Sequence, residues 1–150
     1  MQVESRQEHR WLQQLVGEWT FEMEAIEPGQ PPSRHAGTER VRALGDVWIV
    51  GEGEGEGPDG GTGRSIMTIG FDPARGRFVG TFVSSMMTHL WLYDGAFDGD
   101  GRTLVLESEG PSFTDDGAMV RYRDTIEVVS ADHRILRSEA RAPTMDGRRS

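Results

Sequence analysis

Clusters of Gly, Pro and Asp recur at even intervals along the chain, and this spacing constrains the fold more than any other feature. Each cluster supplies residues that preset a turn or tolerate a positive φ. The segments between the clusters are rich in Val, Ile, Thr, Phe, Trp and Tyr, the composition of half-buried strands. Many short strands joined by tight turns predict an antiparallel sandwich or barrel. The clusters lie at residues 28–32, 58–61, 72–76, 98–101, 115–117 and 146–147.

One helix is expected before the strands, at about residues 7–16. Trp11, Leu12, Leu15 and Val16 fall at i, i+1, i+4 and i+5, and Gly17 follows as a C-terminal stop. We expect this helix to act as a lid or plug for a barrel that runs from about residue 18. The predicted strands are 18–27, 36–44, 46–56, 63–72, 76–87, 88–97, 102–110, 118–129 and 133–142.

The chain stops just after its last turn signal, where another hairpin arm would begin. If a final strand is missing there, an edge of the sheet is left open, which natural barrels avoid. A chain of 150 residues is most simply one domain, spanning 1–150. The sequence therefore predicts a single all-β domain, an antiparallel up-and-down barrel of 9–10 strands with a short N-terminal helix.

Three absent residue types narrow the chemistry. All 16 basic residues are arginine, and the chain has no lysine, cysteine or asparagine, a pattern that a GC-rich genome would produce. Disulfides, thiolate metal sites, lysine Schiff bases and P-loop lysines are thereby excluded. A formal net charge of −9 disfavours nucleic-acid and anionic membrane partners. The polar start lacks a signal peptide's apolar region, so a soluble cytoplasmic protein is expected.

Two predicted strands alternate cleanly enough to assign faces, because successive side chains of a strand point to opposite sides. In residues 118–129, Asp124 stands in a row with Tyr122 and Ile126, opposite a row that holds two arginines. A carboxylate in an apolar row is the informative exception. In residues 18–27, the row predicted to face the core consists of Trp19, Phe21, Met23 and Ala25.

The stretch 84–93 is apolar on both faces if it is extended. A strand of this kind is covered on both sides, by the barrel interior on one and by a helix, a neighbouring chain or a dimer partner on the other. Leu90 and Leu92 would form one face. The other face would line a ligand cavity well, although it also fits an ordinary core with hydrogen-bonded polar tips. This face consists of Met87, His89, Trp91 and Tyr93.

Glycine and glutamate alternate in residues 48–57, without the register of a phosphate-binding loop. Glycines along one strand face allow close approach of another group. The glutamates either form a solvated rim or let Glu52 reach the cavity. Beside Asp124, a buried Glu52 would raise at least one pKa and make an acid/base pair.

His89 is the candidate for a metal or haem ligand or a general acid/base, since its pKa lies near neutrality. The other histidines show no metal-binding spacing, so no metal site is expected. No cofactor is expected either, with haem on His89 kept as a variant that would colour the purified protein.

Gly17-Glu18-Trp19 resembles the GxW signature of lipocalin-like (calycin) barrels, in which the tryptophan packs across the closed end. Together with "LVGEW", "GEGEG", "IMTIGFDP", "RFVGTF", "SSMMTHLWLYDG" and "LESEGPSF" in this order, the chain resembles a bacterial family known as domain of unknown function 1579, from Trp11 to about Gly147. The resemblance implies a lipocalin-like barrel and no established activity. Related barrels bind fatty acids, haem or other hydrophobic molecules, and a few are enzymes. Members of the family continue with one more aromatic-containing strand.

Three functions follow as hypotheses. The first is a barrel that binds a small hydrophobic or amphipathic molecule in its interior. The second is a lipocalin-type isomerase or hydrolase that uses His89 with Asp124 or Glu52 as acid and base. The third is a homodimeric assembly module without a ligand, paired through Leu90 and Leu92 or an open edge. The residues predicted to bind the ligand are Trp19, Phe21, Glu52, Met87, His89, Trp91, Tyr93, Tyr122 and Asp124.

Overall fold

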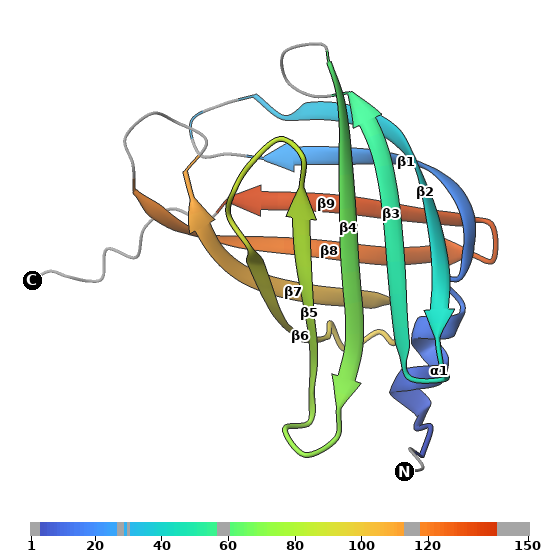
Figure 1. Cartoon of the computed structure of the whole chain (residues 1–150). Helices are drawn as coiled ribbons and strands as arrows, with labels where there is room; N and C mark the ends of the chain where they lie inside the picture. The colour runs from blue at the N-terminus through green and yellow to red at the C-terminus, as the bar shows by residue number, and fades with distance from the viewer. Residues whose placement is uncertain (1–3, 27–28, 30, 57–60, 113–117, 141–150) are drawn as a thin grey trace, which may run out of the picture.

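In the part of the chain that the structure describes, nine strands and one short helix follow the predicted order, with most bounds close to the predicted ones (Figure 1). The computed structural model describes residues 4–26, 29, 31–56, 61–112 and 118–140, with the backbone alone at 23–25. The inward orientation predicted for the side chains of Met23 and Ala25 is therefore outside the described residues. The elements are α1 (Gln7–Gln13), β1 (Gly17–Ile26), β2 (Ser33–Leu44), β3 (Trp48–Glu56), β4 (Thr62–Asp72), β5 (Arg77–Ser84), β6 (Trp91–Phe97), β7 (Thr103–Pro111), β8 (Met119–Ser130) and β9 (His133–Ala140).

The strands form a closed barrel in sequence order. Consecutive strands pair antiparallel, and β9 pairs with β1 in parallel, from Met23 opposite Leu136 to Ile26 opposite Glu139. Nine up-and-down strands bring the first and last together in the same direction, so an odd number closes only through a parallel pair. The expected open edge is wrong for the described strands. A tenth strand after residue 147 would lie outside the described residues.

The helix α1 lies at one end of the barrel, against β3 and β4 (Figure 1). Leu12 and Leu15 are fully buried in the apolar core. Two hydrogen bonds tie the helix to the strand ends: the His9 ring donates from Nε2 to the Phe71 carbonyl at 2.9 Å, and Trp11 Nε1 donates to the Gly101 carbonyl at 2.9 Å. The helix thus plugs this end, as predicted. Within the described ranges, no helix has the length and apolar character of a membrane span.

The helix ends earlier than the predicted residue 16. Leu15 and Val16 bond three residues back, to the carbonyls of Leu12 and Gln13, which tightens the chain into a turn. Gly17 then adopts a φ of +141°, which favours glycine and starts β1.

The barrel interior is packed differently at its two ends. Near the helix it is filled by fully buried side chains, including Ile49, Ile69, Phe78 and Leu104. Farther along the strands, Phe21, Met67 and Phe82 face the interior, because they alternate with outward-facing neighbours. Their side chains are nevertheless only half-buried. The interior is therefore solid at the plugged end and accessible beyond it.

The stretch 84–93 is not one continuous strand. β5 ends at Ser84 and β6 begins at Trp91, so Met87 and His89 lie in the connection between them. Hydroxyl groups stabilise the turn: Met86 N donates to Ser84 Oγ at 3.1 Å, and Arg64 N donates to Ser85 Oγ at 2.9 Å. Trp91 and Tyr93 are buried, as an inward face requires. The expectation that both faces are covered is wrong within this chain, because Leu90 is 52% and Leu92 63% exposed.

Candidate functional site

A carboxylate held by two hydroxyl groups lies inside the barrel. Asp124 on β8 accepts a hydrogen bond of 2.7 Å from the Tyr93 hydroxyl on β6, and the Ser138 hydroxyl on β9 also bonds to it. The strand register makes this possible, since Asp124 lies opposite Leu106 on one side and Ser138 on the other. The structure thus brings together two of the predicted residues, Tyr93 and Asp124, and adds Ser138.

Burial opposes the ionisation of both Tyr93 and Asp124. Burial raises the pKa of Asp124, and the hydrogen bonds from Tyr93 and Ser138 oppose that rise only in part. Burial also raises the pKa of Tyr93 well above its usual value, and the charges of Asp124 and Glu39 raise it further. The phenol is therefore a hydrogen-bond donor at neutral pH, and a charge on Asp124 is costly unless it is compensated.

A second polar pair lies at the plugged end. The fully buried guanidinium of Arg134 on β9 donates to the carboxylate of Glu39 on β2, and it lies 4.6 Å from the centroid of the Trp19 ring. Trp19 Nε1 donates to the Leu15 carbonyl at 2.8 Å. A side chain at Gly51 would collide with the Glu39 carboxylate, so the glycine leaves room for this pair. Trp19 thus joins the helix end to a buried ion pair.

Aromatic rings gather where β6 begins. The Trp91 ring lies edge-on to His89 at 4.7 Å and to Tyr122 at 5.1 Å between centroids. Trp91 Nε1 donates to Met87 Sδ at 2.9 Å, and its ring lies on Gly110, where a Cβ would be about 2.1 Å from Cζ3. The structure therefore brings Met87, His89, Trp91 and Tyr122 together as one cluster.

His89 does not join an acid/base pair with a carboxylate. The imidazole donates a hydrogen bond of 2.9 Å from Nε2 to the Glu109 backbone carbonyl. Asp124 is held by Tyr93 and Ser138 instead. A haem iron bound at Nε2 would have to displace the hydrogen bond to Glu109.

Glu52 lies on the outer face of the barrel, not beside Asp124. Its carboxylate pairs with Arg42 at 2.8 Å, and the side chain is 52% exposed. The predicted acid/base pair of Glu52 and Asp124 is therefore wrong. Strand alternation turns Glu52 and Glu54 outward, while Gly53 between them faces inward.

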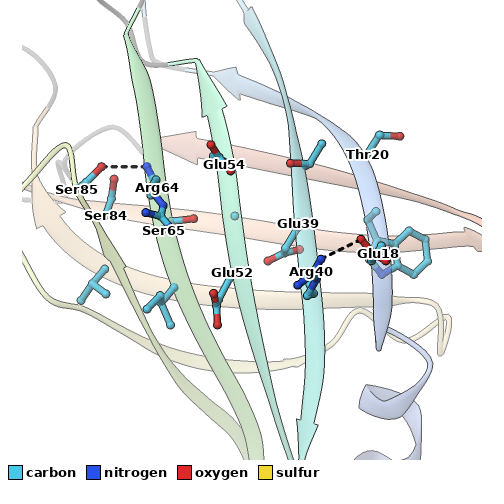
Figure 2. Close-up of a pocket in the computed structure, with 15 residues that line it drawn as sticks. Glu18, Thr20, Glu39, Arg40, Glu52, Glu54, Arg64, Ser65, Ser84 and Ser85 are labelled. Atoms are coloured by element: carbon cyan, nitrogen blue, oxygen red, sulfur yellow. Dashed lines mark hydrogen bonds and ion pairs between the residues drawn. The ribbon is translucent and has the colours of Figure 1, made fainter.

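An outer groove of about 930 Å³ crosses β1 to β5 (Figure 2). Its side chains carry both signs of charge, and Glu18 pairs with Arg40 across it at 3.4 Å. These groups are exposed, and exposed pairs add little to binding or stability. We therefore place the candidate site inside the barrel rather than in this groove.

Three polar residues of the two interior clusters, Glu39, Arg134 and Ser138, were not predicted from the sequence. Glu39 stands in an inward row of residues 36–44 between Gly37 and Val41, the same signal that marked Asp124. Arg134 and Ser138 lack such a signal, because apolar residues stand in both rows of β9. Their positions depend on the pairing of β9 with β8 and β1.

The described strands and the site define a closed β-barrel, plugged by a short helix, with a hydroxyl-bound carboxylate and a buried ion pair inside. The chain belongs to the family described as Protein of unknown function (DUF1579), whose model matches residues 4–149. This confirms the family that the sequence segments resemble. No curated protein matches the chain.

Proposed function

We propose that the protein binds a small hydrophobic or amphipathic molecule inside the barrel. The proposal is supported chiefly by one observation: Phe21, Met67 and Phe82 point inward yet remain half-buried, although Met67 and Phe82 pack against the edge of the core. Apolar surface that faces an interior and stays accessible is the usual lining of a ligand pocket, and a few polar groups fix the ligand's orientation. Tyr93 and Asp124 supply such groups.

Binding of the uncharged dye Nile red tests this proposal. We expect wild-type protein to raise the dye's fluorescence in a saturable titration. Met67→Trp fills the interior and should weaken binding about tenfold or more. Ile66→Trp is the matched control, since Ile66 is the neighbouring residue, is 46% exposed and points outward. Equal losses in both variants, or no binding by the wild type, would contradict interior binding.

As a second candidate function, we propose that the outer face of β4 to β6 pairs with another copy of the chain. Ile66 lies opposite Val83, and both are more than 40% exposed, as are Leu90 and Leu92. The adjoining groove carries arginines and glutamates side by side. A two-fold axis that sets an arginine of one copy against a glutamate of the other would add complementary charges to this apolar contact.

Analytical ultracentrifugation over a concentration series tests this pairing. Leu92→Glu should raise the dimer dissociation constant at least tenfold, because it places a charge in an apolar contact. Met119→Glu, at a residue 56% exposed on β8, is the control and should leave the constant unchanged. A wild type that sediments as a monomer at every concentration would exclude the dimer.

A further inference from the structure

Asp124 lies inside the barrel, and no cation of the described residues forms an ion pair with it. Its hydrogen-bond donors are the hydroxyl groups of Tyr93, at 2.7 Å, and Ser138. The hydroxyls orient the carboxylate, but they do not neutralise its charge.

The interior arginine does not supply the missing charge. Arg134 is fully buried, and its guanidinium pairs with Glu39. This ion pair contributes no net charge, and an ionised Asp124 then leaves the interior with one uncompensated negative charge. Burial is the main cause of the raised Tyr93 pKa, and the charges of Asp124 and Glu39 raise it further, as a negative potential in this region would.

The surroundings of Asp124 suit a positive group with an apolar tail. Tyr93 touches the carboxylate. Trp91 lies two residues before Tyr93 on β6, and Tyr122 lies two residues before Asp124 on β8, and such aromatic rings attract cations. A carboxylate accepts several hydrogen bonds, so two hydroxyl donors leave acceptor positions open. The net charge of −9 also favours the approach of a cation.

Building on the interior binding proposed above, we propose that the ligand is an amphipathic amine whose ammonium group pairs with Asp124 while its apolar part contacts Met67 and Phe82. A neutral donor would leave the buried charge uncompensated, and a carboxylate ligand would meet repulsion from Asp124. The site therefore selects amines over alcohols of equal chain length, and alcohols over fatty acids.

Three ligands with the same twelve-carbon chain separate these classes: dodecylamine, dodecanol and dodecanoic acid, each competed against Nile red. We expect the amine to displace the dye at a concentration at least about tenfold lower than the alcohol, because charged hydrogen bonds are the stronger ones. The acid should be the weakest competitor. This comparison uses the wild-type chain and needs no variant to fold.

Asp124→Asn should remove the preference for the amine over the alcohol. It keeps the size of the side chain but not its charge, so the amine should fall to the level of the alcohol while the alcohol changes less than about twofold. Glu54→Gln removes one exposed charge on the outer face and controls for net charge. Tyr93→Phe removes a donor but not the charge, so it should keep the preference for the amine.

Dependence on pH provides a second measurement. Amine affinity should fall as the pH drops through the pKa of Asp124, because the protonated acid no longer attracts a cation. The groups that face this region are Tyr93, Ser138, Glu39 and Arg134. Persistence of the same pH step in Asp124→Asn would assign it to another group and overturn the proposal.

The outcomes separate this inference from the proposed function. Equal binding of the amine and the alcohol, or tighter binding of the acid, would overturn the pairing with Asp124 and leave interior binding intact. Failure of all three ligands and of Nile red would overturn both.

Discussion

Arg134→Met should destabilise the protein by about 3–5 kcal/mol in urea unfolding, because it leaves the carboxylate of Glu39 buried without its counter-ion. The methionine keeps an apolar stem against the Trp19 ring. The loss of stability therefore reports the missing charge rather than missing packing contacts. In the wild type, the guanidinium is fully buried and the Glu39 side chain is 9% exposed, so little water reaches the carboxylate to replace the missing partner.

A control and a double variant accompany this prediction. Arg137→Met removes a cation from the same strand, but Arg137 pairs with Glu127 at the surface at 3.1 Å, so its loss should cost at most about 1 kcal/mol. Arg134→Met combined with Glu39→Leu removes both charges and should recover most of the lost stability. If Arg134→Met lowered the free energy of unfolding no more than Arg137→Met does, the buried ion pair would not stabilise the protein as we describe.

Leu12→Ala should destabilise the protein by about 2–5 kcal/mol, measured in the same urea experiment. Leu12 is fully buried where α1 plugs the barrel, and the truncation leaves a cavity between the helix and the core. A helix of seven residues does not persist in water by itself, so α1 depends on this burial.

Val16→Ala is the matched control for this prediction. It is also an aliphatic residue near the helix end, but it is 40% exposed, and its truncation should change the free energy of unfolding by less than about 0.5 kcal/mol. Similar losses at both positions would mean that α1 does not plug the barrel.

The strands were predictable because the residues within and next to each strand indicate its ends and its inward face. Turn residues mark where a strand stops, and alternation marks which side chains turn inward, as Asp124 and Tyr122 do. The prediction was wrong where local contacts compete with alternation. At residues 85–90 the hydroxyls of Ser84 and Ser85 stabilise a turn, and Met87 and His89 leave the strand.

The candidate site was only partly predictable. Tyr93 and Asp124 were each identified as inward residues, but their hydrogen bond joins strands separated by β7. Glu39 and Arg134 are 95 residues apart, and no local pattern connects them. Glu52 was placed as a possible partner of Asp124, and alternation together with Arg42 turns it outward instead.

The sequence by itself determined the order of the strands, the plug helix and the inward position of Asp124, because these depend on turn chemistry and on a period of two along the chain. Only the tertiary structure decided the parallel closure of β1 on β9, the ion pair inside the barrel and the hydroxyl donors around Asp124. These depend on which residues of distant strands lie opposite each other, and that register is set by the packing of the whole barrel.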